Sequence, residues 1–315
     1  MEVEGMKVNT NYDIIGDIHG HAKELKNLLS SLGYSEENGY YQHESRKVLF
    51  VGDYIDRGPE IRDVLRIVKG MTDNNQAVAL MGNHEYNCLC YHTKGKDDQY
   101  LRAHTDKNQK QHRATLDQFE AHQKEWREYL DWMRHLPLWI ENDHFRAVHA
   151  CWSQSVIDSL TKTLDGNRLP LDLLEESANE DSILFEQIEI TLKGKELSLP
   201  NGLTFADKDG HPRKNVRIKW WMQPENITYE ALKVNPEYEV PDVLVDSNHP
   251  ILADVYPTDA KPVFFGHYWL RGTPAIYESN VCCLDYSVAK KGKLVAYRYG
   301  GEGVLDNDNL SWQII

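Results

Sequence analysis

Three short, glycine-flanked polar motifs constrain this chain most strongly, because each directly follows an apolar run. They read "GDIHG" at 16–20, "GDYIDRG" at 52–58 and "GNHE" at 82–85. The glycines let the backbone turn sharply beside the polar side chains. In open α/β sheets, ligands bind where strands end and loops begin. The motifs therefore predict a polar site assembled at the ends of neighbouring strands.

The first hundred residues alternate strand patterns with helix patterns. Apolar runs predict strands over 12–15, 47–53 and 76–83, and apolar residues at i, i+3, i+4 and i+7 predict helices over 22–33 and 59–70. A third helix is expected through "EYNCLCY" at 85–91, after the third strand. Gly70 is placed just past the end of the second helix. This rhythm predicts a parallel or mixed sheet covered by helices.

The rest of the chain is less regular. Residues 93–114 are polar and are expected to form an exposed excursion, before a long helix over about 115–135. Alternating patterns then predict a second, more antiparallel sheet from the runs "LPLWIEND", "FRAVHA", "KPVFFGH", "VCCLDY" and "KLVAYRYG". Between them, about 153–260 has weak periodicity, and we expect it to form a cap or insertion over the site.

Polar side chains follow five of the predicted strands. They are carboxylates, imidazoles and one amide, without a thiolate: Asp17, His19, Asp53, Asn83, His149 and His267. Oxygen and imidazole donors suit Mn, Fe or Zn, and Mg less well. Two ions about 3.5–4 Å apart need a shared ligand. Asp53 lies on the middle strand and is the predicted bridge.

The motif order resembles a known family. The three motifs are spaced by about thirty residues and are followed by "VHA" at 148–150 and "GH" at 266–267. This pattern is similar to the phosphoprotein phosphatase branch of the calcineurin-like metallophosphoesterases, of bacterial type, from residue 13 to about 299. The expected fold is α/β with four layers, in which two mixed β-sheets form a sandwich flanked by helices. We expect one domain over 1–315, with the dimetal site at strand ends.

The resemblance implies the metal ligands. Asp17 and His19 would bind the first ion, and Asp53 would bridge. The coordination of the second ion would be completed by Asn83, His149 and His267. The expected cofactors are two divalent ions, manganese first, with Fe, Zn or Mg as alternatives.

The resemblance also implies the catalytic residues. His84 would be the general acid, Asp56 would hold it charged and oriented, and Arg57 would clamp phosphate oxygens. A carboxylate neighbour raises the pKa of a histidine, which suits an acid near neutrality. An arginine fork matches phosphate geometry. A hydroxide activated by the metals would attack phosphorus in line, without a covalent enzyme intermediate.

Some positions depart from the family pattern or remain open. Bulky aromatic residues follow the late histidines, namely Trp152, Tyr268 and Trp269. A second phosphate-binding arginine is left open among Arg213, Arg217 and Arg271. Asp285 is expected to be a turn residue. We expect Trp126, Trp132 and Trp139 in the core, and the histidines outside the motifs in solvent, including His21, His104, His112 and His122.

Composition narrows the function classes. The chain has 35 Lys and Arg against 49 Asp and Glu, a formal net charge of -14, whereas nonspecific polyanion binding needs a basic face. No apolar run approaches the roughly 20 residues of a membrane helix, and the first residues do not resemble a secretory signal. We therefore expect a cytoplasmic protein with no nucleic-acid or membrane partner. The oligomeric state stays open.

The five cysteines are expected to be reduced thiols: Cys88, Cys90, Cys151, Cys282 and Cys283. Cys88 and Cys90 resemble half of a zinc knuckle, but no second pair stands at the required spacing. None is followed six positions later by the arginine that a thiol-based tyrosine phosphatase needs.

The predicted function is a dimetal phosphomonoesterase. The leading substrate is phosphorylated protein, on Ser/Thr or Tyr, with small phosphate esters as the other class. Alternatives are a symmetrical diadenosine tetraphosphate hydrolase and a nucleic-acid end-processing enzyme, which the acidic balance disfavours. A catalytically inactive binding scaffold is the alternative of another class; it predicts a missing ligand, and the sequence lacks none.

Overall fold

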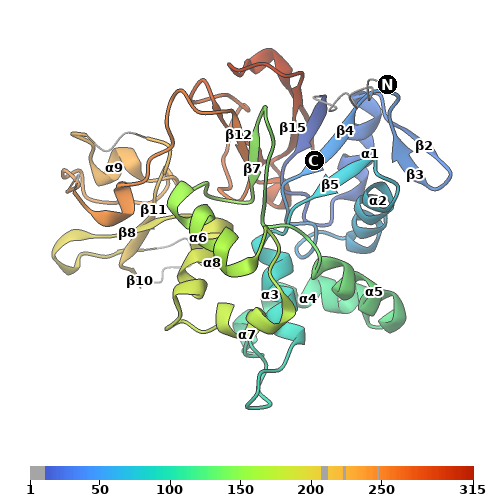
Figure 1. Cartoon of the computed structure of the whole chain (residues 1–315), viewed down its shortest axis with the longest axis horizontal. Coiled ribbons are helices and arrows are strands. Elements are labelled where there is room, and N and C mark those ends of the chain that lie inside the picture. The colour runs from blue at the N-terminus through green and yellow to red at the C-terminus, as the bar shows by residue number, and fades with distance from the viewer. Residues whose placement is uncertain (1–10, 207–211, 223–224, 247) are drawn as a thin grey trace, which may run out of the picture.

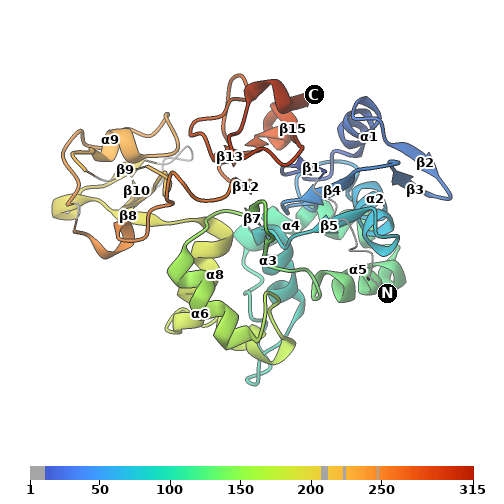
Figure 2. The ribbon, with the colours of Figure 1, turned by 45° about the horizontal axis from the view of Figure 1, so that its top comes forward.

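Two β-sheets form the centre of the protein. The computed structural model describes residues 11–206, 212–222, 225–246 and 248–315. Helices flank the two sheets, and a smaller group of strands extends to one side, at the left of Figures 1 and 2. The predicted α/β fold with two mixed sheets and flanking helices is confirmed.

The first sheet contains the strands that carry the motifs. Its order is β14-β15-β1-β4-β5, and β16 pairs with β15. The strands β1, β4 and β5 are parallel, and β15 is antiparallel to β1. Their bounds are β1 Tyr12–Ile15, β4 Lys47–Phe50, β5 Ala77–Ala79, β14 Asp285–Tyr286, β15 Lys293–Tyr299 and β16 Leu310–Ile314.

The second sheet has the order β13-β12-β7-β6 and corrects one prediction. Its bounds are β6 Trp139–Glu141, β7 Arg146–Val148, β12 Val263–Phe265 and β13 Val281–Cys283. The pairs β7/β12 and β12/β13 are parallel, and only β6/β7 is antiparallel. The expectation of a mainly antiparallel second sheet is therefore wrong. Strand patterns within the sequence do not specify a partner, and the segment 293–299 pairs with β1 instead.

Alternate strand residues face different layers, as the period of a strand requires. Ile14 and Leu49 pack between the sheets with Phe264. Ile15 and Phe50 face the opposite way and pack in the core cluster that contains the helices. Because both faces of β1 and β4 are buried, these strands appear in the sequence as continuous apolar runs.

The predicted early helices are present with shifted ends. They are α1 Ala22–Ser31, α2 Ile61–Asp73 and α3 Asn83–His92, and a hairpin of β2 Ser35–Glu37 and β3 Tyr40–Gln42 follows α1. The second helix continues past Gly70, so the predicted stop there is wrong. The helix ends instead before Asn75, whose φ of 58° is the left-handed conformation that terminates helices.

The long helix predicted over about 115–135 is two helices, α4 Asp106–Phe119 and α5 Gln123–Met133. The break lets Phe119 pack on Trp126, with ring centroids 4.6 Å apart. Half of the predicted excursion 93–114 is thus the start of α4, which Thr105 caps by accepting the amide hydrogen of Asn108. Trp126 and Trp139 are buried, and Trp132 is half-buried against the same core, as predicted.

The region predicted as a cap consists of two parts. The helices α6 Gln154–Leu164, α7 Leu174–Ser177 and α8 Ile183–Lys193 contribute to the main core. The elements β8 Glu196–Ser198, β9 Phe205–Ala206, β11 Asn215–Arg217 and α9 Tyr229–Leu232 share a separate apolar cluster, and the exposed strand β10 Pro212–Arg213 pairs with β9. The short 3-10 helices are η1 Leu171–Leu173, η2 Pro200–Gly202, η3 Pro250–Leu252, η4 Val288–Lys290 and η5 Asn307–Asn309. We call the part from β8 to η3 the side lobe.

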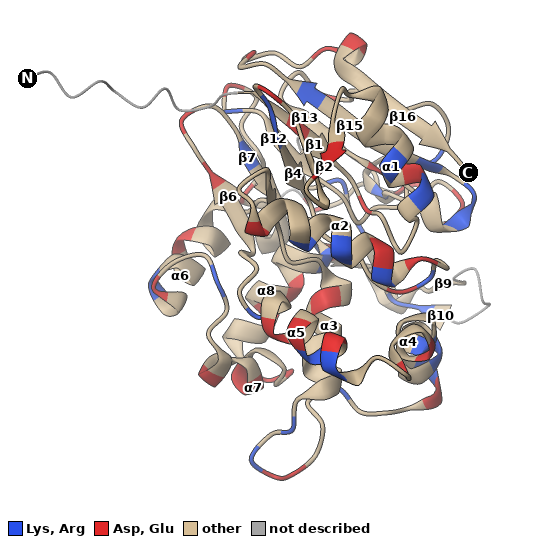
Figure 3. Ribbon diagram, turned by 90° about the vertical axis from the view of Figure 1, so that its right-hand side faces the viewer, with Lys and Arg blue, Asp and Glu red and all other residues tan. Residues whose placement is uncertain are grey.

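The surface mixes charges of both signs. On the face in Figure 3, Lys and Arg are interspersed with Asp and Glu instead of forming one basic stripe. Within the described residues, no helix combines the length and apolar character needed to cross a bilayer.

A buried ion pair anchors β1 at its outer end, and its removal should be costly. Asp13 is fully buried and accepts hydrogen bonds from Arg46 Nε at 2.9 Å and from the Tyr34 hydroxyl at 3.0 Å. Arg46→Met leaves the carboxylate without its close cation, and breaking a buried pair costs about 3–5 kcal/mol. We expect a loss of that size in the free energy of unfolding, measured by urea denaturation.

The matched control is Arg66→Met, which removes an exposed pair with Asp63 at 3.2 Å. It should change stability by about 1 kcal/mol or less. Equal losses in the two variants would contradict the role of the Asp13 pair.

Candidate dimetal site

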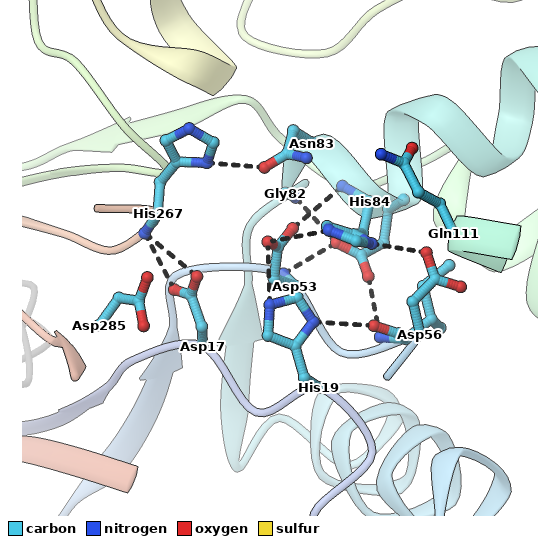
Figure 4. A network of polar contacts seen from close by, with 12 residues as sticks. Asp17, His19, Asp53, Asp56, Gly82, Asn83, His84, Gln111, His267 and Asp285 are labelled. Carbon is cyan, nitrogen blue, oxygen red and sulfur yellow. Dashed lines mark hydrogen bonds and ion pairs between the residues drawn. The ribbon is translucent and has the colours of Figure 1, made fainter. Parts of the chain in front are cut away.

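The strand-end residues predicted as metal ligands converge in one buried cluster. Asp17 and His19 follow β1, Asp53 follows β4, and Asn83 begins α3 after β5, while His149 and His267 follow β7 and β12. Figure 4 shows the convergence from these separate elements. Two neighbouring sheets thus contribute to one cluster of carboxylate, imidazole and amide groups.

Asp53 occupies the centre of the cluster. Its Oδ2 lies 3.5 Å from His19 Nε2, and its Oδ1 lies 3.4 Å from His149 Nε2. The two carboxylate oxygens therefore face imidazoles from two different sheets. This is the arrangement that a ligand shared by two ions requires, and it supports the proposed bridging role.

The hydrogen bonds of the histidines leave lone pairs directed into the cluster. His149 Nδ1 donates to the carbonyl oxygen of Val51 at 2.8 Å, so in the neutral ring Nε2 carries a lone pair. Against the effect of burial, the carboxylate of Asp53 raises the pKa of His149, and a divalent ion on Nε2 would take the place of the second proton. That nitrogen lies 3.1 Å from Asn83 Oδ1 and 3.4 Å from Asp53 Oδ1. When the Asn83 oxygen faces this nitrogen, three electron-rich atoms lie together: His149 Nε2, Asn83 Oδ1 and Asp53 Oδ1. A cation between them would coordinate all three.

His19 and His267 also have a ring nitrogen that a cation could coordinate. His19 Nδ1 donates to the carbonyl oxygen of Ile55 at 3.0 Å, and burial lowers the pKa of His19 to about 4, so its imidazole is neutral at pH 7. The Nε2 atoms of His19 and His267 are buried and have no hydrogen-bond partner among the residues that the structure describes. Buried polar atoms are rarely left unsatisfied. These donors fit two divalent ions on either side of Asp53.

Ligand atoms within 4.8 Å of one another form two groups around Asp53: one contains His19 and His84, and the other contains His149 and His267. Asp17 is outside both groups. Its carboxylate accepts the backbone N–H of His267 at 3.1 Å. Burial, together with Asp285 and Asp53, raises the pKa of Asp17 well above its usual range. A nearby divalent ion would remove this penalty, which agrees with the proposed role of Asp17 as a ligand of the first ion.

The motif glycines are required by close contacts. A Cβ at Gly266 would lie 1.9 Å from Asp17 Oδ1, and one at Gly82 would lie 2.3 Å from Asp53 Oδ1. Asp53 and His267 have φ values of 56° and 72°, which are strained for residues with a side chain. The folded sheets hold these turns in place and keep the polar groups directed at one another.

His84 and Asp56 form a pair beside the cluster. His84 Nδ1 donates to Asp56 Oδ2 at 2.5 Å, and His84 Nε2 lies 4.0 Å from Asp53 Oδ2. Burial by itself would lower the pKa of His84, but the carboxylates of Asp53 and Asp56 outweigh it and raise the pKa. A raised pKa suits a general acid that works near neutrality. The contact with the Asp56 carboxylate therefore supports the proposed role of His84 as the general acid.

Asp56 has further partners that sequence reasoning missed. His112 Nδ1 donates to Asp56 Oδ1 at 2.8 Å, and the Thr115 hydroxyl donates to the same oxygen at 2.6 Å. The prediction that His112 lies in solvent is wrong, because α4 packs against α2 and α5 and buries the His112 ring against Tyr91, His92 and Trp126. No local pattern links His112 to Asp56, which is 56 residues away.

Glu85 is the second residue that the sequence did not assign. Its carboxylate accepts backbone N–H groups from Asp53 at 2.9 Å, Tyr54 at 2.8 Å and Gly82 at 3.0 Å. It therefore ties the second motif to the third and fixes the backbone of Asp53. The only signal was its place in the string "GNHE".

Asp285 faces Asp17 in Figure 4 but is occupied by backbone contacts. Its Oδ2 accepts the N–H of Trp269 at 2.7 Å, and its Oδ1 accepts the N–H of Ser287 at 2.9 Å. These bonds hold the segment after His267. Asp285 itself begins strand β14, so the expectation of a turn residue is wrong.

A cavity of about 270 Å³ adjoins His267 and contains most of the candidate arginines. Arg57, Arg217 and Arg271 line it, and Arg213 lies in a different cavity. Within the described residues, no ion pair joins Arg57 to Asp53 or Asp56; its guanidinium instead lies 5.3 Å from the centroid of the Trp269 ring. Arg57 is thus available to a ligand in the cavity.

The central position of Asp53 generates a prediction about metal content. Asp53→Asn should lower the metal content below one ion per chain after desalting, because the shared charge is lost from both groups. Elemental analysis of the purified variant checks this. Asp285→Asn is the matched control, since it neutralises another buried carboxylate nearby, and it should keep two ions. Two ions bound to the Asp53 variant would rule out the bridge.

Comparison with known proteins connects this site to a family. A family model described as calcineurin-like phosphoesterase matches residues 11–268. The asymmetrical bis(5′-nucleosyl)-tetraphosphatase PrpE of Oceanobacillus iheyensis is 47% identical over 73 residues, which are 23% of this chain and 29% of that protein. PrpE of Bacillus subtilis is 45% identical over 74 residues, 23% of this chain and 30% of its own length. The matched segment is thus less than a third of these relatives.

Solved structures with a similar fold include two phosphatases. A protein serine/threonine phosphatase from Saccharomyces cerevisiae has 14% identity and a TM-score of 0.49, over 98% of this chain and 80% of that one. The cold-active protein-tyrosine phosphatase of a Shewanella species has 16% identity and a TM-score of 0.47, over 97% and 80%. Since the family model spans most of the sequence, the chain belongs to the calcineurin-like phosphoesterase family and is a phosphoester hydrolase.

Proposed function

We propose that this hydrolase cleaves the phosphate chain of a bis(5′-nucleosyl) tetraphosphate. The observation that carries the proposal is the charge of the cavity beside His267. Four cationic side chains line it, Arg57, Arg217, Arg271 and Lys290. Arg217 is paired with Glu196 and Arg271 with Glu237, and an anionic phosphate chain would compete with these carboxylates for the two guanidinium groups. A lone phosphomonoester beside two metal ions has no need of so many cations, whereas a row of ionised phosphates does.

A neighbouring cavity offers room for a nucleoside. It has a volume of about 550 Å³, is lined by Trp221, Trp269 and Tyr277, and shares Trp269 and Arg271 with the cationic cavity. Aromatic side chains stack on bases. A phosphate chain in the first cavity would therefore continue into a compartment suited to its nucleoside.

The proposed mechanism assigns each step to a residue of this chain. The two divalent ions, held by the ligands around Asp53, would supply Lewis acidity and activate the attacking water. Arg57 and Arg217 would bind phosphate oxygens and orient the chain. His84 would give the proton on Nε2 to the leaving oxygen. Asp56 would keep His84 protonated through the 2.5 Å hydrogen bond.

The leading expectation from the sequence, phosphorylated protein, is the competing hypothesis. The named relatives are asymmetrical tetraphosphatases, whereas the alternative expected from the sequence is the symmetrical reaction. The two reactions differ in products: asymmetrical cleavage of diadenosine tetraphosphate yields ATP and AMP, and symmetrical cleavage yields two ADP. The matches are short, so we propose the substrate class and let the products decide the cleavage position.

Substrate preference tests the proposal directly. Diadenosine tetraphosphate and peptides bearing pSer, pThr or pTyr are assayed in parallel with the Mn²⁺-loaded enzyme, and nucleotide products are separated by anion exchange. We expect kcat/KM for the dinucleotide to exceed that for every phosphopeptide. Faster cleavage of a phosphopeptide would overturn the proposal and support a protein phosphatase.

Two arginines of the side lobe refine this test. Arg217→Gln should raise KM for the dinucleotide about 10–100-fold, because hydrogen bonds to charged groups contribute about 1.5–3 kcal/mol. Arg213→Gln is the matched control, since Arg213 lies outside the cationic cavity. Both should leave cleavage of p-nitrophenyl phosphate nearly unchanged. An equal effect of the two substitutions would remove Arg217 from the substrate site.

The contact between His84 and Asp56 generates a prediction about turnover. His84→Asn removes the proposed acid but no proposed metal ligand. We expect kcat to fall about 10²–10⁴-fold, as is typical of general acid–base catalysis, with two ions still bound. Steady-state kinetics and elemental analysis measure the two effects. Wild-type turnover would exclude His84 as the acid, and loss of metal would indicate a ligand instead.

A further inference from the structure

A second group of potential metal ligands lies behind the acid pair. Cys88 and His92 are on α3, four residues apart and therefore on one face of the helix. His112 comes from α4. The thiol sulfur and one nitrogen of each imidazole lie within 4.8 Å of one another. None of these residues belongs to the proposed dimetal cluster.

The two imidazoles meet in a way that suits a shared cation. His112 Nδ1 donates to Asp56 Oδ1, so its Nε2 carries a lone pair. That Nε2 forms a hydrogen bond with His92 Nε2 at 3.2 Å, and a cation bound by both nitrogens would replace the proton between them. Two nitrogens at zinc distances of about 2.0–2.1 Å and a tetrahedral angle are about 3.3 Å apart. The separation of the two nitrogens thus already matches that of two ligands on one ion.

We propose that Cys88, His92 and His112 form a third metal site, which takes a zinc-type divalent cation. The site is separate from the substrate assignment above and does not depend on it.

The donor set explains the choice of metal. One thiolate and two imidazoles favour Zn²⁺ over the harder Mn²⁺ and Mg²⁺. The Cys88 thiol is buried, and burial raises its pKa, so binding must release its proton to solvent. His92 is half-buried. Trp126 packs against both imidazoles, with ring centroids 5.5 Å from His92 and 6.1 Å from His112. Water would complete a tetrahedral site.

The location of the site suggests a positioning role for the metal beside the His84–Asp56 pair. A cation on His112 Nε2 would hold the Nδ1–H of that ring on Asp56, in the carboxylate–histidine–metal arrangement common in zinc proteins. Asp56 Oδ2 in turn binds His84. The metal would therefore connect α4 to α3. It would also fix the position of His84 indirectly, through His112 and Asp56.

Cobalt provides a selective test, because a thiolate bound to Co²⁺ gives a charge-transfer band in the near ultraviolet and the proposed dimetal ligands include no thiolate. Metal-free protein is titrated with Co²⁺, and the band is recorded together with the metal content. We expect the band to saturate with one ion per chain and Zn²⁺ to displace it. Complete occupancy of the dimetal cluster without any such band would overturn the proposal.

Matched substitutions on one helix locate the band. Cys88→Ser and His92→Gln should each abolish it and lower the total Zn²⁺ content by one ion per chain. Cys90→Ser is the control, since Cys90 is also buried on α3 but is absent from the cluster. It should keep the band. If Cys88→Ser does not fold, His92→Gln still decides, because a full-strength band without His92 would refute the three-ligand site, as would a band lost only in Cys90→Ser.

Discussion

The structure depends on one buried carboxylate with imidazoles on both sides. Asp53 directs its two oxygens at His19 and His149, which come from different sheets. An anion in such a place is costly unless cations compensate it. The proposed pair of ions would provide that compensation, and would simultaneously join the two halves of the sandwich at their strand ends. The same proposed pair of ions would therefore serve both the stability of the fold and the chemistry of the site.

A layer of hydrogen bonds makes this cluster rigid. Glu85 binds the backbone of the second motif and of the third, so the two loops cannot move independently. Asp56 collects His84, His112 and Thr115 from two helices. Each of these carboxylates accepts several hydrogen bonds. Together these bonds keep the backbone at Asp53 in its strained conformation. Positioning of this kind is what catalysis by oriented groups needs.

Substrate choice depends on a different part of the chain. The dimetal cluster is built from the main body, whereas Arg217 and the segment 234–238 of the side lobe complete the wall of the cationic cavity. A lobe with its own apolar cluster can vary without disturbing the sheets.

The proposed third metal site connects the acid pair to the helical layer. Cys88 and His92 are close in sequence, but His112 reaches them only because α4 packs against α2 and α5 and brings this side chain beside His92. The spacing of Cys88 and Cys90 resembles half of a zinc knuckle, but the structure places Cys88 next to His92 and His112 instead. Ligands on one helix face are visible in a sequence, whereas the ligand from another helix is not.

By itself, the sequence determined the fold class, the early strands and helices, and the ordered motifs that place Asp17, Asp53, Asn83 and the two late histidines at strand ends. Those features depend on local periodicity and on glycines, which act over a few residues. Only the tertiary structure decided the parallel pairing of β7 with β12, the burial of His112 against Asp56 and the choice of Arg217 over Arg213 for the cavity. Each of these joins segments far apart along the chain, and such contacts are set by packing of whole layers, for which short sequence patterns carry no signal.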